Sequence, residues 1–261
     1  MYDAVLSPVN ALLWLNKYKG IKSELANLVL DIKTDYSYNE RLVHATDGSL
    51  KFSDAYVLKS LLYQYKPARI LEVGSFLGFS TRWLLEVSSQ WGAEVTAVDP
   101  NVRHRIFDDP QSILKKLNQN FYPENLEIVQ GFFGNYGDCT YFDYENYEPK
   151  LSKSDIDKLM KERKIIDENW GRKFDFVFID GDHEYKAVME NFAIALNLLS
   201  DGGCIAFHDV LTWKGVNDAL QELSLKYQSK AEVKIYGKLD KQVLERVFNK
   251  SNDGIGSFRL L

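Results

Sequence analysis

The stretch Arg69-Ile-Leu-Glu-Val-Gly-Ser-Phe-Leu-Gly-Phe-Ser-Thr81 decides the fold of this chain. It starts as a run of strand-forming residues, Ile70–Val73, breaks at Gly74, and passes after Gly78 into a helical pattern that continues to Val87. Glycines let a backbone approach a ligand closely, and the first turn of a helix offers unpaired N–H groups. The order strand, glycine turn, helix therefore predicts a site for a nucleotide-like ligand.

Size and composition indicate a folded globular protein. The 261 residues suit one elaborated α/β domain, and 45% hydrophobic content is ordinary for such a domain. A net charge of −5 argues against nucleic acid or an anionic membrane as partner, because both attract clustered Lys and Arg. Cys139 and Cys204 are far apart and outside any CxxC, so we expect reduced thiols. No basic region precedes the apolar N-terminal residues, and no apolar run reaches the ~20 residues of a membrane span. We therefore expect a cytoplasmic protein.

Strands and helices are expected to alternate around the opening stretch. Residues 1–52 should form an N-terminal helical extension, divided into two helices at Gly20, and residues 53–261 the main domain. A helix over 54–65 should begin at Ser53 as N-cap. This alternation is typical of a parallel sheet with helices on its faces. The expected strands are 70–73, 94–98, 126–129, 174–179, 204–207, and a late pair at 231–236 and 255–260.

An insertion interrupts the alternation between residues 132 and 173, where such a sheet normally needs a loop and one helix. Its second half, Lys153–Arg163, is predicted to be a charged helix. Its first half is rich in Tyr and Asp. The tyrosines there could form a lid over an acceptor, the core of a small subdomain, or a dimer surface: Tyr136, Tyr141, Tyr144 and Tyr147.

The glycine turn lacks the features of two common nucleotide sites. A dinucleotide fingerprint needs GxGxxG, but positions 76 and 79 are Phe76 and Phe79, and no GxxxxGK[ST] is present. Glu72, just before the turn, would repel a pyrophosphate. A carboxylate suits a ligand with positive charge at this point, such as S-adenosylmethionine with its ammonium and sulfonium groups.

Three stretches carry a resemblance to a known family. Residues 70–81 resemble the first motif of class I S-adenosylmethionine-dependent methyltransferases. Phe174–Lys186, FDFVFIDGDHEYK, and Leu198–Val210, LLSDGGCIAFHDV, resemble segments of the cation-dependent catechol-type O-methyltransferases and of a bacterial group that methylates sugars and natural-product hydroxyls. The resemblance covers about residues 53–220. It implies an α/β fold with a Rossmann-like, doubly wound, seven-stranded sheet, mostly parallel with an antiparallel last strand.

The resemblance also implies a set of cofactor-binding residues. Asp99, at the end of the second strand, falls where the family binds the ribose hydroxyls, and Phe132 could stack near the adenine. Each has a plainer interpretation, because Asp99 could be a turn residue and Phe132 a core residue. The full expected cofactor set is Glu72, Gly74, Ser75, Gly78, Ser80, Asp99, Gly131, Phe132 and Asp180.

Asp180, at a strand end, falls where open α/β sheets bind ligands. In the cation-dependent relatives this position binds a divalent metal, and the following strand supplies an Asp-Asn pair where this chain has His208-Asp209. Asp180, His208 and Asp209 are therefore candidate metal ligands. The two carboxylates suit Mg²⁺, whereas His208 shifts the preference toward Mn²⁺, Fe²⁺ or Zn²⁺, or means that no metal binds.

His183 occupies the position of a lysine base in the catechol-type enzymes. An imidazole has an ordinary pKa near 6.5 and can accept a hydroxyl proton, so His183 and Asp180 are the expected catalytic residues. His183 could instead orient a neighbour at a helix N-terminus. His44 and His104 are outside every motif and are expected at the surface.

These features predict an S-adenosylmethionine-dependent O-methyltransferase acting on a hydroxyl of a small molecule, a sugar or natural product. We expect no nucleic-acid or membrane partner and allow a homo-oligomer. Two alternatives remain open. Asp180, His208 and Asp209 would satisfy the ligand set of an iron-dependent oxygenase. The chain could also bind S-adenosylmethionine without catalysis.

Overall fold

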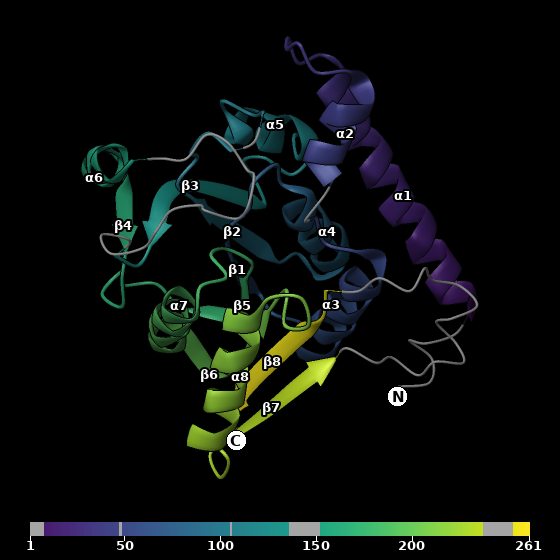
Figure 1. The fold of residues 1–261 in the computed structure, drawn as a ribbon. Coiled ribbons are helices and arrows are strands. Elements are labelled where there is room, and N and C mark those ends of the chain that lie inside the picture. Colours follow the sequence, from purple (N-terminus) through teal and green to yellow (C-terminus); the bar gives the residue numbers. More distant parts are fainter. Residues whose placement is uncertain (1–7, 47–48, 105, 136–151, 237–252) are drawn as a thin grey trace.

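A mixed sheet forms the centre of the molecule. The computed structural model describes residues 8–46, 49–104, 106–135, 152–236 and 253–261. The strands are β1 (Arg69–Val73), β2 (Glu94–Asp99), β3 (Leu126–Phe133), β4 (Lys164–Ile166), β5 (Phe174–Ile179), β6 (Leu199–Phe207), β7 (Ala231–Tyr236) and β8 (Ile255–Leu260). They lie in the order β4-β3-β2-β1-β5-β6-β8-β7 (Figure 1). The strand pairs are parallel except those of β8 with β6 and β7. The expected α/β fold with an antiparallel last strand is confirmed.

Helices cover both faces of the sheet (Figure 1). They are α1 (Pro8–Leu30), α2 (Tyr38–Thr46), α3 (Phe52–Tyr65), α4 (Phe79–Ser88), α5 (Pro110–Leu117), α6 (Lys153–Glu162), α7 (Tyr185–Leu198) and α8 (Lys214–Lys226). Successive strand residues point to opposite faces. In β5, Phe176 and Phe178 pack into a core with α1, α3, α4 and α5, whereas Val177 and Ile179 pack into a second core with α7 and α8. Two separate cores are what a doubly wound sheet requires.

The glycine turn joins β1 to α4 in a conformation that few other residues adopt. Gly74 and Gly78 both have left-handed backbones, with φ of 84° and 82°. A Cβ on Gly74 would lie 2.3 Å from the carbonyl oxygen of Asp180, so only glycine allows the ends of β1 and β5 to approach this closely. Glycine at this position is therefore required by the close approach of the two strand ends.

The insertion adds an eighth strand that the sequence pattern does not predict. The charged helix α6 is confirmed, and β4 follows it to pair with β3 at the sheet edge. A Cβ on Gly131 would lie 2.6 Å from the carbonyl oxygen of Lys164, so Gly131 allows β4 to reach β3. Three residues are too few to show strand periodicity. Tyr136, Tyr141, Tyr144 and Tyr147 lie outside the described residues.

Two predictions for the first 65 residues, one on Gly20 and one on Ser53, are wrong. Gly20 does not divide the N-terminal segment: α1 runs through Gly20 as one helix, because Ile21, Leu25 and Val29 bury one face of its second half. Tertiary packing of this kind outweighs the cost of roughly 1 kcal/mol for an interior glycine. The N-cap of α3 is Lys51 rather than Ser53.

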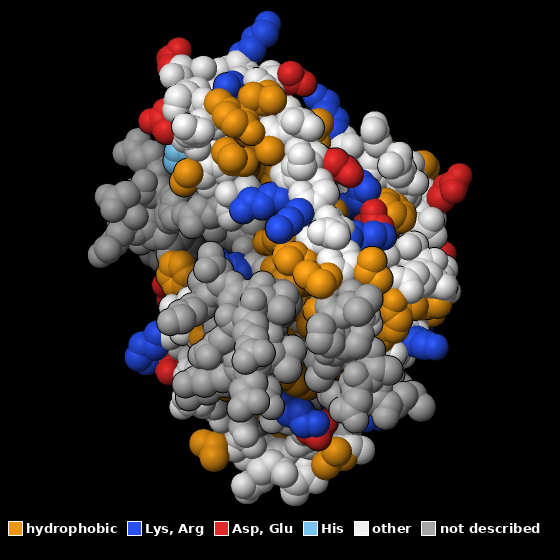
Figure 2. All heavy atoms as spheres, turned by 90° about the vertical axis from the view of Figure 1, so that its right-hand side faces the viewer, with side chains coloured by type: hydrophobic (Ala, Val, Ile, Leu, Met, Phe, Trp, Pro, Cys, Tyr) orange, Lys and Arg blue, Asp and Glu red, His pale blue; other side chains and the backbone are white. Residues whose placement is uncertain are grey.

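The face that carries α1 and α2 is chemically mixed. In Figure 2 hydrophobic side chains alternate with Lys, Arg, Asp and Glu on this face. Leu12 and Leu13 of α1 and Val43 of α2 are exposed hydrophobic residues of these two helices. In the part of the chain that the structure describes, every helix is too short or too polar to cross a bilayer.

Candidate active site

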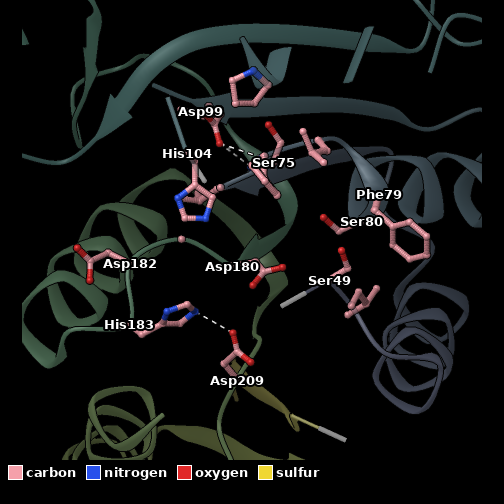
Figure 3. Close-up of a pocket in the computed structure, with 18 of the residues that line it drawn as sticks. Ser49, Ser75, Phe79, Ser80, Asp99, His104, Asp180, Asp182, His183 and Asp209 are labelled. Carbon is pink, nitrogen blue, oxygen red and sulfur yellow. Dashed lines mark hydrogen bonds and ion pairs between the residues drawn. The ribbon is translucent and has the colours of Figure 1, made fainter. Parts of the chain in front are cut away.

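A cavity of about 360 Å³ lies at the carboxyl ends of the parallel strands. Its wall includes Asp99 at the end of β2, Asp180 and His183 after β5, and Asp209 after β6 (Figure 3). Parallel strands end at one edge of the sheet, so residues far apart in sequence meet there. We call the part around Asp99 and Ser75 the cofactor end, and the part around Asp180, His183 and Asp209 the acceptor end.

At the cofactor end, backbone N–H groups hold the carboxylate of Asp99. The amides of Ser75 and Phe76 donate to its Oδ2 at 3.1 and 3.0 Å, and the amide of Asn101 donates to its Oδ1 at 2.7 Å. Phe76 has a left-handed backbone with φ of 43°, which turns two successive N–H groups toward the same oxygen. Burial raises the pKa of Asp99, and these three N–H groups oppose that shift.

Glu72 lies beneath the glycine turn rather than in the cavity wall. Its side chain is fully buried and accepts a hydrogen bond from the hydroxyl of Thr81. Burial raises the pKa of Glu72 to about 8, although hydrogen bonds from Ser80 and Thr81 lower it in part. A large fraction of this carboxyl group is therefore protonated at neutral pH.

At the acceptor end, two imidazoles face two carboxylates. His183 Nε2 lies 2.8 Å from Asp209 Oδ2. His208 Nδ1 lies 2.9 Å from Asp180 Oδ1 and 3.4 Å from Asp209 Oδ2, and its Nε2 lies 3.7 Å from Asp54 Oδ2. His208 is thus surrounded by three carboxylates.

These contacts shift two pKa values in opposite directions. Burial opposes a charge on His208, but Asp180, Asp209 and Asp54 together raise its pKa well above the ordinary value. Burial would raise the pKa of Asp209, yet the bonds to His183 and His208 lower it strongly. The acceptor end therefore contains an ionised Asp209 beside a protonated His208.

Two further features fix the geometry of His183 and Asp209. The ring of His183 stacks on Trp213, with centroids 4.7 Å apart and planes 7° from parallel. Asp209 has a left-handed backbone with φ of 62°, a strained conformation for a residue with a side chain. The amide of Trp213 donates to the Asp209 carbonyl at 3.0 Å, so one turn holds both partners of His183.

Among the residues that the structure describes, two groups of side chains offer ligand atoms that converge enough for a metal ion. Asp180, His183 and Asp209 form one group, and Asp54, His208 and Asp253 form the other. His208, the expected nitrogen ligand, is buried and belongs to the second group, whereas the first group lines the cavity and contains His183. His183 is therefore a further candidate nitrogen ligand beside Asp180 and Asp209.

Most predicted site residues line the cavity, and four do not. Those in the wall are Gly74, Ser75, Ser80, Asp99, Gly131, Asp180, His183 and Asp209. Glu72, Gly78, Phe132 and His208 are outside it. Gly78 packs against α5, since a Cβ there would lie 2.7 Å from Asn118 and Leu114 side-chain atoms. Phe132 is buried in the core, and Phe133 lines the cavity instead, because neighbouring strand residues point to opposite faces.

Several wall residues have no sequence signal. His104, expected at the surface, lines the cavity and packs edge-on against Phe76 with ring centroids 4.9 Å apart. Lys51, Trp213 and Asp253 also line it. Lys51 and Asp253 belong to no motif and form an ion pair although 202 positions separate them in the sequence. Pattern analysis of a single chain therefore has no means of finding this pair.

A family model described as "Methyltransferase domain" matches residues 71–210 of this chain, more than half its length. Among curated proteins, no sequence matches it.

Solved structures of similar shape come from fungi and bacteria. An SAH-bound methyltransferase of Podospora anserina is 15% identical, with 92% of this chain and 88% of that chain covered and a TM-score of 0.54. The O-methyltransferase TomG of Streptomyces achromogenes, in complex with SAM, is 17% identical, with 88% and 92% covered and a TM-score of 0.54. An O-methyltransferase of Bacillus cereus in complex with SAH is 17% identical, with 93% and 91% covered and a TM-score of 0.52. At these identities the likeness establishes a shared fold.

Proposed function

This chain belongs to the methyltransferase domain family, and we propose that it transfers a methyl group from S-adenosylmethionine to a hydroxyl group of a small molecule. One observation carries the proposal: a single cavity joins the backbone-held carboxylate of Asp99 to the imidazole–carboxylate pairs of the acceptor end. Methyl transfer needs a donor site and an acceptor site side by side. The SAM- and SAH-bound structures of similar fold support the identity of the donor.

The groups at the cofactor end fit a nucleoside. Each carboxylate oxygen can accept about two hydrogen bonds. Asp99 Oδ1 accepts one, from Asn101, and so keeps capacity for a ribose hydroxyl. The hydroxyl of Ser75 is buried at the cavity wall and has no hydrogen-bond partner among the described residues. An unpaired hydroxyl beside a carboxylate is suited to a sugar ligand.

S-adenosylmethionine, when bound, supplies a methyl group on a positively charged sulfur. The protein then has two tasks: to hold the acceptor oxygen in line with that methyl group, and to take the proton of the hydroxyl as the new bond forms. The walls of the cavity perform the first task by excluding other orientations.

The second task falls to the pair of His183 and Asp209. Their contact at 2.8 Å lets the pair accept the hydroxyl proton as a unit, with the carboxylate compensating the charge that develops on the imidazole. Stacking on Trp213 limits rotation of the ring. A general base held in this way typically increases the reaction rate by roughly 10²–10⁴-fold.

A divalent metal ion is a second proposal for the acceptor end. The convergence of Asp180, His183 and Asp209 supports it, and a bound cation would lower the pKa of the acceptor hydroxyl. EDTA should then abolish turnover, and Mg²⁺ or Mn²⁺ should restore it. Full turnover in EDTA would leave the His183–Asp209 pair as the base alone. Turnover that needs iron and dioxygen would support the oxygenase alternative.

Calorimetry with S-adenosylhomocysteine tests the cofactor assignment. Asp99→Ala should weaken binding by about 30–100-fold, equivalent to roughly 2–3 kcal/mol for lost charge-assisted hydrogen bonds. Asp201→Ala is the matched control, because Asp201 is an exposed residue near the start of β6 and does not line the cavity. Failure of the wild-type protein to bind either S-adenosylhomocysteine or S-adenosylmethionine would refute the proposal and leave the fold unaffected.

Transfer of labelled methyl from S-adenosylmethionine to a panel of hydroxylated compounds tests the reaction. We expect product with at least one sugar or phenol. Cofactor binding without transfer to any compound, together with unchanged binding in His183→Ala, would favour the non-catalytic alternative.

A further inference from the structure

An ion pair between Lys51 and Asp253, which lie far apart in the sequence, forms part of the cavity wall. Lys51 Nζ lies 2.8 Å from Asp253 Oδ2 and 3.0 Å from Asp253 Oδ1. Both residues line the cavity together with Asp209 and Trp213. The pair therefore belongs to the acceptor end.

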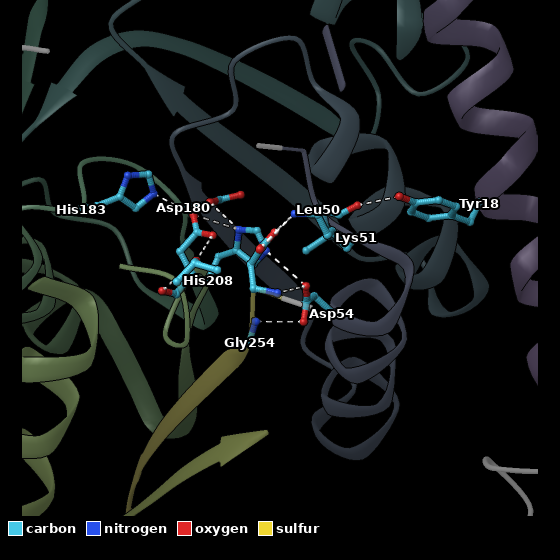
Figure 4. A network of polar contacts seen from close by, with 11 residues as sticks. Tyr18, Leu50, Lys51, Asp54, Asp180, His183, His208 and Gly254 are labelled. Atoms are coloured by element: carbon cyan, nitrogen blue, oxygen red, sulfur yellow. Dashed lines mark hydrogen bonds and ion pairs between the residues drawn. The ribbon is translucent and has the colours of Figure 1, made fainter. Parts of the chain in front are cut away.

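Contacts behind the cavity hold this ion pair in place. The carboxylate of Asp54 accepts hydrogen bonds from the amides of Asp253 and Gly254, at 2.9 and 3.1 Å. Lys51 is the N-cap of α3, the helix that carries Asp54 (Figure 4). Because Asp54 accepts a hydrogen bond from the backbone amide of Asp253, the position of Asp253 does not depend on its own carboxylate.

The acceptor end carries an excess of negative charge. Asp180, Asp182, Asp209 and Asp253 all line the cavity, and among its described wall residues Lys51 is the only lysine or arginine. Burial would lower the pKa of Lys51, but Asp253, Asp209 and Asp54 raise it, so the amine is charged. Among the described wall residues, Lys51 is thus the one permanent cation that the protein offers an acceptor when no metal ion is bound, and Asp253 already neutralises it.

We propose that the Lys51–Asp253 pair selects the charge of the acceptor: it admits neutral hydroxylated molecules and excludes those that carry a carboxylate or phosphate. This inference rests on the proposed function, since it concerns the acceptor of methyl transfer. The ammonium of Lys51 can donate to a hydroxyl, and the carboxylate of Asp253 can accept from one.

An anionic acceptor would bind unfavourably. It would have to compete with Asp253 for Lys51 at 2.8 Å while lying close to Asp209. Like charges that close together in a partly buried cavity repel one another, and specificity then comes from that repulsion as much as from attraction. Removing the charge of Asp253 should release Lys51 and convert the wall into a carboxylate site.

The test compares neutral and carboxylated versions of the same probe: glucose with glucuronate, and catechol with 3,4-dihydroxybenzoate. Binding is measured by NMR titration of the protein saturated with S-adenosylhomocysteine, in EDTA so that no divalent metal ion adds positive charge to the acceptor end. The variants are Asp253→Asn, Lys51→Met and the double variant. Asp253→Asn keeps the size of the side chain and the hydrogen bond from the backbone amide to Asp54, so the fold should persist.

We expect wild type to bind each carboxylated probe at least 10-fold more weakly than its neutral partner. Asp253→Asn should strengthen binding of the carboxylated probes at least 10-fold, and the double variant should lose that gain. The proposal is overturned if wild type binds both members of each pair equally, if Asp253→Asn brings no gain, or if the gain survives in the double variant. Should S-adenosylhomocysteine itself fail to bind, the cofactor proposal fails instead, and the same titrations without it still decide the role of the pair.

Discussion

The two ends of the cavity hold their carboxylates by different means. At the cofactor end, Asp99 is held by backbone N–H groups from its own turn and from the glycine turn. At the acceptor end, Asp180 and Asp209 are held by the side chains of His208 and His183. Main-chain contacts survive most substitutions, whereas side-chain contacts depend on single residues.

This difference has a consequence for function. A cofactor is the same for every member of a family, so a site made from backbone can serve all of them. Acceptors differ, and a site made from side chains can change with a few substitutions. We therefore expect variants at the acceptor end to alter turnover and specificity while cofactor binding persists, and the four predictions below test that division in order of decreasing effect.

His183→Ala should reduce methyl transfer by about 10²–10⁴-fold, because the proton of the acceptor hydroxyl loses its base. Affinity for S-adenosylhomocysteine should stay within threefold of wild type. The measurements are turnover with the acceptor found in the panel and calorimetry with S-adenosylhomocysteine. Equal losses of both would show that the two ends are not separable.

His208→Gln should lower the free energy of unfolding by about 3–5 kcal/mol, because Asp54 and Asp180 would lose the cation between them. Urea denaturation measures the change. His44→Gln is the matched control, since His44 lies in α2, outside the cavity wall, and packs edge-on against Tyr36; it should cost under about 1 kcal/mol. A small loss in His208→Gln would mean that the carboxylates do not depend on imidazole pairing.

Glu72→Gln should stabilise the protein at alkaline pH. The pKa of Glu72 is about 8 in the folded state against 4.5 in the unfolded chain, so folding takes up a proton between these values. Wild-type stability should fall as pH rises from about 4.5 to 8, and the variant should lack that contribution. We expect the variant to be more stable by about 2–4 kcal/mol at pH 8 and equal near pH 4.5. Parallel stability curves for the two proteins would contradict a neutral, buried Glu72.

Ser75→Ala should change the free energy of unfolding by under about 0.5 kcal/mol, because the hydroxyl has no partner among the described residues. It should weaken S-adenosylhomocysteine binding by about 5–10-fold if that hydroxyl pairs with the ligand. Thermal unfolding and calorimetry separate the two effects. Unchanged affinity would remove Ser75 from the cofactor set and leave Asp99 as its main polar anchor.

Local patterns predict the cofactor end well because its contacts are local. Strand, glycine turn and helix are consecutive, and Asp99 is the last residue of the next strand along the chain. Even here the prediction for the aromatic residue of the cavity is off by one position. The sequence favours Phe132, whereas Phe133 lines the cavity, because successive strand residues point to opposite faces.

Patterns fail at the acceptor end and in the N-terminal segment for a related reason. Lys51 and Asp253 pair across nearly the entire sequence, and no spacing rule connects them. His208 belongs to a recognised motif, yet only the structure shows that it is buried among three carboxylates and lies outside the cavity wall. Gly20 breaks a local helix rule because distant helices bury its neighbours.

By itself the sequence determined the α/β class, the mostly parallel sheet with its reversed last strand, and the glycine turn beside Asp99. Each of these follows from residues close together in the chain, where periodicity and turn chemistry act. Only the tertiary structure decided that His183 pairs with Asp209 and that Lys51 is neutralised by Asp253. It also decided that the buried His208 contacts three carboxylates, those of Asp54, Asp180 and Asp209. Those pairings depend on which strand ends meet at the edge of the sheet and on how completely each charge is buried there.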